Sequence, residues 1–416
     1  MDEYEKDMPR AEAGGGSVFD LFQNKKGKKS ATARHKGEKS KNKATEMSKR
    51  EEDPKKKKKK AAAAEKTVDK DEGENTRMVT TTVQNLASSA APAPGAASAG
   101  HPIVESWCQR ALDFGVEKLR DEFRQLAKYT KPDMTQNAFN ANCSPTMTET
   151  KNRYQDVPCQ DQHIVKLEKP PAPNDYIHAN FVGTPANPEK RFICTQGPLD
   201  QTVEDFWWMI VQQKVERIIM LCKTIECGKF KCAQYWPEKA GEKKQCGPIS
   251  IENASGPTPM DGDGEIQVTM LNVVYNGTTY AVRHLHWTDW PDRGVPPCKL
   301  TSLDLLSTVR GTKTPIVVHC SAGIGRTGTI VAIEYILEKI SYAASKEFPP
   351  MPDLVKALRD MRAFSIQNDL QYLYIHRVML NYFLEKYKDK YSAILTPDNV
   401  SKYEKFIKDY NTAVGQ

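Results

Sequence analysis

Apolar residues are distributed unevenly along the 416 residues of this chain, and their spacing separates two regions. In residues 1–102 apolar side chains are sparse and recur at neither the helical nor the strand period. Such a segment cannot bury enough surface to offset the entropy lost on ordering. We therefore predict that residues 1–102 are disordered, whereas the regular apolar pattern from residue 103 onward predicts a folded region.

Both secondary-structure periods occur in the folded region. Apolar residues three and four positions apart predict helices at 104–128, 202–214, 300–309, 326–340, 351–361 and 368–388. Short apolar runs predict strands at 191–196, 217–222 and 315–318. Strand patterns at 266–275 and 278–287 flank Asn276-Gly277, a dipeptide that favours the type I′ turn of a β-hairpin.

Strands interspersed with helices predict an α/β fold, in which a central mixed sheet has helices on both sides. We predict one domain over residues 103–388. The polar segment 389–416, with its scattered aromatic residues, fits either a short helix or a loose C-terminal tail. No stretch reaches the roughly 18 apolar residues of a membrane-spanning helix, and the acidic N-terminal sequence does not resemble a signal peptide.

Positive charge is concentrated in the N-terminal region. Of the formal net charge of +7, residues 1–100 carry +6, from 22 Lys and Arg against 16 Asp and Glu. The segment 25–60 is the most basic and ends in six consecutive lysines. It is expected to make weak, salt-dependent contacts with anionic membrane surfaces or nucleic acid, and it also fits a nuclear import signal.

The ten cysteines show no paired spacing. Cys222, Cys227 and Cys232 lie close together, but no Cys-x2-Cys element or matching histidine pair accompanies them. We therefore expect no metal site and a reduced, cytoplasmic setting, with nuclear or membrane-surface association through the basic segment.

Residues 319–328 read His-Cys-Ser-Ala-Gly-Ile-Gly-Arg-Thr-Gly, between the predicted strand 315–318 and the predicted helix 326–340. A glycine-containing loop in this position presents backbone N–H groups and the positive end of a helix to a phosphate. Arg326 can donate two hydrogen bonds to phosphate oxygens. Cys320 lies where the same groups stabilise a thiolate, the form that attacks phosphorus. The residues predicted to hold the phosphate are Ser321, Ala322, Gly323, Ile324, Gly325 and Arg326.

A cysteine and an arginine at this spacing also arise by chance, and a buried cysteine is usually only a small apolar side chain. The whole decapeptide, however, resembles the signature of the protein tyrosine phosphatase family. Further motifs extend the resemblance over residues 103–385, in the family's order. The resemblance implies a highly twisted sheet of the cysteine-phosphatase type, and hydrolysis of phosphotyrosine in proteins through a phosphocysteine intermediate, without a cofactor. It makes Cys320 the nucleophile, with His319 and Thr327 in support.

Trp290-Pro291-Asp292, about 28 residues before Cys320, resembles the family's mobile acid loop. The resemblance makes Asp292 the general acid that protonates the leaving phenolate oxygen, and Trp290 the anchor of the loop. It also implies that Lys231 pairs with Asp292 and that Glu226 contacts Arg326.

Lys151-Asn152-Arg153-Tyr154, followed by Asp156, resembles the family's phosphotyrosine-recognition loop. By this resemblance Tyr154 stacks on the substrate ring and Asp156 accepts hydrogen bonds from the substrate backbone. A deep pocket of this kind predicts tyrosine specificity, because phosphoserine would not reach Cys320. Gln155 stands where the family commonly has a basic residue, which bears on peptide preference.

Residues 367–372 resemble the family's glutamine loop, in which Gln367 and Gln371 position the water that hydrolyses the phosphocysteine. Asn368 replaces the usual threonine, and asparagine is an equally good helix N-cap. With Gln371 three residues later, the sequence predicts a capping box.

Two other functions compete with this interpretation. A pseudophosphatase would hold phosphotyrosine without turnover, but such proteins typically lack the nucleophile, the acid or the arginine. A scaffold located by its basic tail would depend on segment 25–60 instead of on Cys320. The leading hypothesis is an active phosphatase that acts on phosphotyrosine proteins as a monomer.

Overall fold

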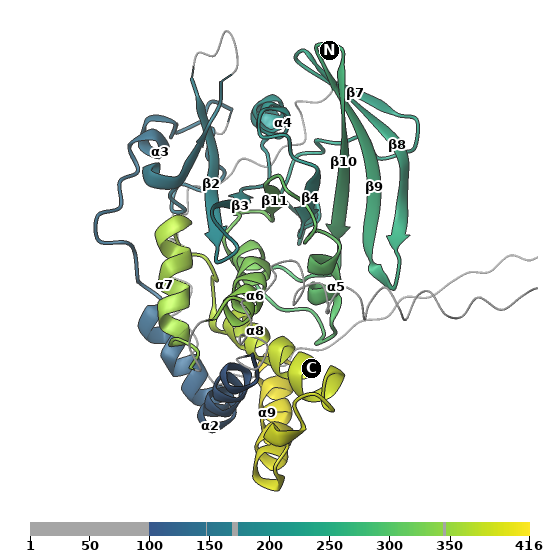
Figure 1. The fold of residues 1–416 in the computed structure, drawn as a ribbon. Coiled ribbons are helices and arrows are strands. Elements are labelled where there is room, and N and C mark those ends of the chain that lie inside the picture. Colours follow the sequence, from purple (N-terminus) through teal and green to yellow (C-terminus); the bar gives the residue numbers. More distant parts are fainter. Residues whose placement is uncertain (1–99, 147, 169–173, 344–346) are drawn as a thin grey trace, which may run out of the picture. The chain divides into compact units, whose positions relative to one another are not determined.

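The computed structural model describes residues 100–416, apart from 147, 169–173 and 344–346 (Figure 1). The predicted disorder of 1–102 therefore falls almost entirely outside the described residues. The prediction was wrong for its last three residues, because helix α2 begins at Gly100.

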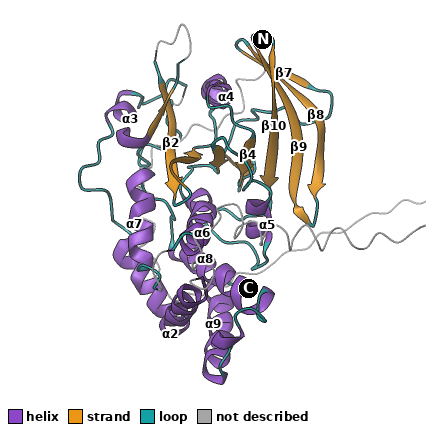
Figure 2. Ribbon diagram, in the orientation of Figure 1, coloured by secondary structure: helices purple, strands orange, loops and turns teal. Residues whose placement is uncertain are grey.

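A nine-stranded mixed sheet forms the centre of the described region, with the order β1-β2-β3-β11-β4-β10-β9-β8-β7. Its strands are drawn in orange in Figure 2. Its strands are β1 (Ile164–Lys166), β2 (Tyr176–Thr184), β3 (Asn187–Thr195), β4 (Arg217–Met220), β7 (Lys243–Cys246), β8 (Ile249–Met260), β9 (Asp263–Tyr275), β10 (Thr278–Trp287) and β11 (Ile316–His319). The four central strands β3, β11, β4 and β10 are parallel, and all the outer pairs are antiparallel. A separate hairpin consists of β5 (Ile225–Glu226) and β6 (Lys229–Phe230).

Helices flank this sheet, which confirms the predicted fold class. They are α2 (Gly100–Leu126), α3 (Asn137–Ala141), α4 (Val203–Gln212), α5 (Thr301–Ser307), α6 (Gly325–Ser341), α7 (Met351–Met361), α8 (Asp369–Asn381) and α9 (Pro397–Val414). In Figure 1, α4 lies above the central strands, and α5, α6 and α8 lie below them. The predicted helix 368–388 ends as an α-helix at Asn381 and continues as a π-helical turn, Tyr382–Lys386.

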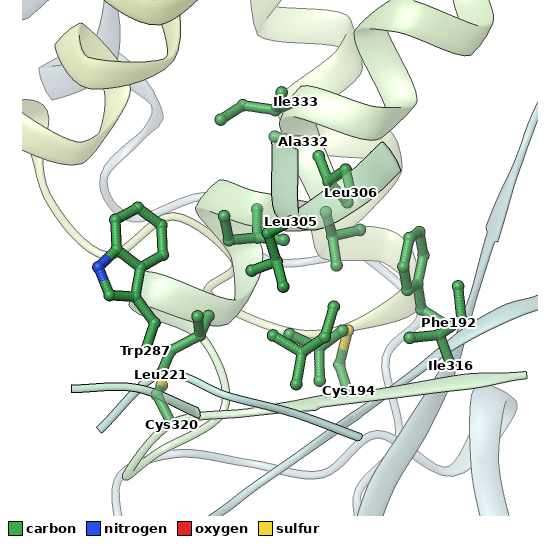
Figure 3. Packing of buried hydrophobic residues seen from close by; sticks show 14 of the residues in the cluster. Phe192, Cys194, Leu221, Trp287, Leu305, Leu306, Ile316, Cys320, Ala332 and Ile333 are labelled. Atoms are coloured by element: carbon green, nitrogen blue, oxygen red, sulfur yellow. The ribbon is translucent and has the colours of Figure 1, made fainter. Parts of the chain in front are cut away.

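The sequence pattern of the central elements explains their burial. β11 is buried along its whole length, as its uninterrupted apolar run requires for a parallel strand covered on both faces. Figure 3 shows part of the apolar cluster around it, which includes Cys320. Helix α6 is buried on more than the one face that its spacing predicted, because it packs against the sheet and against α8.

The predicted hairpin is present between β9 and β10. Tyr275 pairs with Thr278, so two residues form the turn. Asn276 and Gly277 have φ values of 46° and 74°, as a type I′ turn requires.

The predicted domain end at residue 388 was wrong. Residues 397–414 form an 18-residue helix, α9, that packs against α2 and α8. Thr396 caps it by accepting a hydrogen bond from the N–H of Asn399 (3.3 Å), and Gly415 ends it in a left-handed conformation. Its buried aromatic residues explain why the segment is part of the fold: Tyr403, Phe406 and Tyr410.

We expect a chain of residues 100–388 to be less stable than one of residues 100–414. Burial of three aromatic side chains contributes on the order of 5 kcal/mol, since each buried apolar side chain contributes about 1.5–3 kcal/mol. Calorimetry should show a Tm lower by at least about 10 °C for the shorter chain. A chain of residues 100–416 is the control and should match the one ending at 414. Equal Tm values for the chains ending at 388 and 414 would contradict the role of α9.

Candidate active site

The loop from Cys320 to Arg326 connects β11 to α6 at the carboxyl end of the parallel strands. Its tight path depends on glycine at two positions. Gly323 has a φ of 69°, and a Cβ there would lie 2.1 Å from the carbonyl oxygen of Thr195. A Cβ on Gly325 would lie 3.0 Å from side-chain amide atoms of both Gln367 and Gln371. The predicted glutamine loop therefore lies directly over the predicted phosphate-binding loop.

Cys320 is buried, and the N–H of Gly323 donates a hydrogen bond to its Sγ (3.3 Å). Burial opposes ionisation of this thiol, but the positive charge of Arg326, assisted by Thr327 and Gly323, outweighs it. The pKa of Cys320 is therefore lowered, which favours the nucleophilic thiolate.

Arg326 is buried and held from two directions. Its Nη1 and Nη2 donate to the two carboxylate oxygens of Glu226, at 2.6 and 2.8 Å. Nη1 also donates to the carbonyl oxygen of Trp290 (3.0 Å). Burial disfavours the charge, but the paired carboxylate reverses this effect, so the pKa of Arg326 is raised. The guanidinium is thus a fixed cation next to the thiol.

The predicted acid loop lies against this cation. Asp292 Oδ1 is 3.6 Å from Arg326 Nη2, and Asp292 Oδ2 accepts a hydrogen bond from Lys231 Nζ (2.8 Å). The indole of Trp290 is buried and donates to the carbonyl oxygen of Gly294 (3.1 Å), which fixes the turn from within. The side-chain amide of Asn368 donates to the carbonyl oxygen of Arg293 (2.9 Å) and so links the acid loop to the glutamine loop.

The predicted recognition loop also borders the phosphate-binding loop. The hydroxyl groups of Tyr154 and Ser321 are hydrogen-bonded at 2.8 Å, so the Tyr154 ring reaches the phosphate-binding loop. The guanidinium of Arg153 donates to the carbonyl oxygens of Gly197 (2.9 Å) and Pro198 (2.6 Å), which anchors this loop. Asp156 follows, half-buried, on the same loop.

The expected capping box at α8 forms only in part. Asn368 accepts a hydrogen bond from the N–H of Gln371 (2.9 Å), as predicted for an N-cap. The side chain of Gln371, however, accepts from the N–H of Gln367 (2.9 Å) rather than from that of Asn368. This bond fixes the two glutamines relative to each other above Gly325.

His319 is close to Cys320 but is uncharged. Burial lowers its pKa to about 3. Its Nδ1 lies 3.3 Å from the carbonyl oxygen of Cys320 and therefore donates to it. Its Nε2 then accepts from the hydroxyl of Tyr235 (2.8 Å), which is also 2.7 Å from Nε2 of His284. The contribution of His319 is to orient the start of the loop.

Arg362 also belongs to the site, although the sequence analysis did not assign it a role at the phosphate-binding loop. The guanidinium of Arg362 is completely buried and donates to the carbonyl oxygens of Ala322 and Gly323, each at 3.1 Å. It also donates to Asn180 Oδ1 (2.8 Å). Arg362 thereby occupies the carbonyl oxygens of Ala322 and Gly323 and fixes this part of the loop. Its position five residues before Gln367 is the available sequence signal.

Among the described residues, no group of three or more His, Cys, Asp or Glu side chains is arranged to hold a metal ion. In the same part of the chain, no helix combines the length and apolar character needed to cross a membrane. The arrangement instead brings together a thiolate, a fixed cation and a carboxyl group around an anion-binding loop. This combination is typical of a cysteine-based phosphate-binding site.

A family model, Protein-tyrosine phosphatase, matches residues 148–381, which is more than half of the chain. The chain belongs to the protein-tyrosine phosphatase family, and the resemblance seen in the sequence is confirmed. It is 30% identical over 301 residues to the human phosphatidylinositol phosphatase PTPRQ, covering 69% of this chain and 12% of that protein. It is 35% identical over 269 residues to the human tyrosine-protein phosphatase non-receptor type 9, covering 60% of this chain and 44% of that protein.

The chain thus spans less than half the length of these curated relatives. A solved structure of PTPN18, concerned with distinct HER2 tyrosine phosphorylation sites, superimposes with a TM-score of 0.60 at 27% identity. The match covers 68% of this chain and 99% of that one. A second PTPN18 structure, in complex with HER2 phosphopeptides, has the same TM-score and identity.

Proposed function

We propose that this chain hydrolyses phosphotyrosine in proteins through a phosphocysteine intermediate. The observation that carries the proposal is the lowered pKa of Cys320 beside Arg326, which is fixed by Glu226. A thiolate, a cation that pairs with phosphate oxygens and a carboxyl group within reach are the three groups that this reaction needs.

In the first step the Cys320 thiolate attacks phosphorus, so the S–P bond forms and the P–O bond to tyrosine breaks. Asp292 gives its proton to the leaving phenolate oxygen. Arg326 and the loop N–H groups neutralise the charge on the phosphoryl oxygens.

In the second step a water positioned by Gln367 and Gln371 attacks phosphorus and gives its proton to Asp292. The S–P bond breaks, and inorganic phosphate leaves with the Cys320 thiolate restored.

A module that only binds phosphotyrosine explains this geometry less well. Binding requires Arg326 and the loop N–H groups but no acid held at 2.8 Å from a lysine on a second loop. The presence of Cys320, Asp292 and Arg326 together favours turnover over binding alone.

We expect the protein to prefer phosphotyrosine peptides over phosphoserine peptides of the same sequence by at least about 100-fold in kcat/KM. Tyr154 contacts Ser321 of the phosphate-binding loop. The Tyr154 side chain therefore forms one side of a deep pocket, in which a short side chain cannot bring its phosphate to Cys320. Steady-state kinetics on matched peptides measure the ratio. A phosphatidylinositol phosphate should be assayed beside the two peptides, because the name of one relative refers to phosphatidylinositol.

Two variants of Tyr154 test the depth argument. Tyr154→Ala should lower the preference, mainly by raising KM for the phosphotyrosine peptide. Tyr154→Phe keeps the ring and loses only the hydrogen bond to Ser321, so it should keep the preference. Similar kcat/KM values on all substrates of the unmodified protein would contradict tyrosine specificity.

We further propose that the protein is cytoplasmic and that segment 25–60 brings it to anionic membrane surfaces. Full-length protein should sediment with phosphatidylserine vesicles more than residues 100–416 do at low salt, and the difference should fade as salt rises. Both forms should hydrolyse a soluble phosphopeptide equally. Substitution of glutamine for the six lysines 55–60 is the matched control for charge. Equal sedimentation of both forms would contradict membrane contact, and preferential binding to nucleic acid would replace it.

A further inference from the structure

Two large apolar side chains project into solvent from the short β5–β6 hairpin. Phe230 is 79% exposed and Ile225 is 51% exposed. Among the described residues, Tyr342 and Val400 are the only other exposed large apolar side chains. Phe230 and Ile225 differ from those two because their hairpin also carries residues of the candidate active site.

The pairing of the hairpin places both side chains on the same face. Ile225 pairs directly with Phe230, and Glu226 pairs with Lys229. Directly paired residues project to the same side of a two-stranded ribbon, and neighbours along a strand project to opposite sides. Glu226 reaches inward to Arg326, so Ile225 and Phe230 form one apolar patch on the outer face.

The patch is continuous with the loops that surround the pocket. Lys231 directly follows Phe230 and holds Asp292. The carbonyl oxygen of Phe230 accepts a hydrogen bond from Arg153 (3.5 Å), the residue before Tyr154. The patch therefore lies on the rim where the recognition loop meets the hairpin that holds the signature arginine and the acid.

Nothing in the catalytic arrangement requires apolar side chains here. The inward contacts use Glu226, Lys231 and the backbone of Phe230, and a polar residue at 225 or 230 would leave all of them in place. Large apolar side chains exposed beside a polar site are typical of a surface that becomes covered on binding.

We propose that Ile225 and Phe230 form a docking surface for an apolar side chain of the substrate, close in sequence to the phosphotyrosine. The proposal rests on the function proposed above. The bond from Arg153 to the backbone of Phe230 joins the rim to the recognition loop, so the side chain that docks belongs to a residue close in sequence to the phosphotyrosine. The inference names a substrate class: phosphotyrosine sites with a large aliphatic or aromatic neighbour at one flanking position.

The test uses phosphotyrosine peptides with alanine at the flanking positions, in which leucine or serine replaces one alanine at a time. For the unmodified protein, leucine at one position should raise kcat/KM roughly tenfold over serine. Phe230→Ser and Ile225→Thr should each reduce this ratio, and the double variant should bring it to within about twofold of one. Phe230→Leu keeps an apolar side chain and should retain the preference.

For each variant, kcat/KM for the peptide is divided by kcat/KM for a small aryl phosphate, which cannot reach the rim. This normalisation removes any effect of the substitution on the catalytic groups themselves. Tyr342→Ser is the matched control, because Tyr342 is also 51% exposed but lies at the end of α6. It should leave the leucine preference unchanged.

The inference is overturned if the unmodified protein shows no apolar preference at any position, or if Phe230→Ser keeps the full preference. It is also overturned if the patch joins two copies of this chain. In that case Phe230→Ser would convert a dimer to a monomer and leave the peptide preference unchanged. Failure to hydrolyse the aryl phosphate would instead contradict the proposed function itself. The two failures are therefore distinguishable.

Discussion

Replacement of Cys320 by serine is expected to abolish hydrolysis of phosphotyrosine peptides and small aryl phosphates, with kcat lower by at least about 10⁴-fold. The site lowers the pKa of a thiol, mainly through the charge of Arg326 against the opposing effect of burial. A serine hydroxyl ionises far less readily in the same place, so the nucleophile is lost. Phosphopeptide binding, measured by calorimetry, should persist because Arg326 and the loop N–H groups remain.

Cys246→Ser is the matched control, since it makes the same chemical change at a buried cysteine on the edge strand β7. It should leave kcat unchanged. A metal chelator should also leave the unmodified protein fully active, because the attack is driven by a thiolate. Turnover by a folded Cys320→Ser protein at close to the normal rate would mean that another group attacks phosphorus.

Local sequence patterns predicted most of the elements that position this site. The run 315–318 and the glycine-containing loop after it predicted β11, the anion-binding loop and the start of α6. Asn276-Gly277 predicted the tight hairpin, because a two-residue turn depends only on its own residues. These features are encoded within a few residues, so periodicity and turn chemistry were sufficient.

Features that depend on distant partners were not predictable in the same way. Arg362 bonds Asn180, 182 residues away in the sequence, and no local period reports such a contact. The burial of α9 depends on the surface that α2 and α8 offer. The contacts of Lys231 with Asp292 and of Glu226 with Arg326 were expected only through family resemblance, and the structure contains both.

The uncharged state of His319 shows a further limit of sequence reasoning. The resemblance placed His319 in support of Cys320 without giving its charge, and complete burial lowers the pKa of His319 to about 3. Burial is set by Tyr235, Phe206 and the neighbouring strands, which come from separate parts of the chain. The positive charge that lowers the pKa of Cys320 therefore comes from Arg326 and not from His319.

Asp292→Ala is expected to lower kcat on phosphotyrosine peptides by about 10²–10⁴-fold, with little change in KM. The acid acts on the leaving oxygen in the transition state, whereas Arg326 and the loop hold the bound substrate in both states. Aryl phosphates with a good leaving group, such as nitrophenolate, should lose less, because they need less protonation. Asp289→Ala, three residues earlier at an exposed carboxylate, is the control and should retain full activity.

The pH dependence of the reaction provides an independent measurement. Burial tends to raise the pKa of Asp292, but the hydrogen bond and charge of Lys231 and the charge of Arg326 lower it overall. The free protein therefore holds Asp292 ionised at neutral pH, and a general acid must be protonated. Bound phosphate adds negative charge beside Arg326 and raises the pKa of Asp292 again.

We expect kcat to fall toward alkaline pH as Asp292 loses its proton. In Asp292→Asn this alkaline decline of kcat should be absent. A rise in KM with unchanged kcat in Asp292→Ala, or an alkaline decline that survives in Asp292→Asn, would assign the proton to another group.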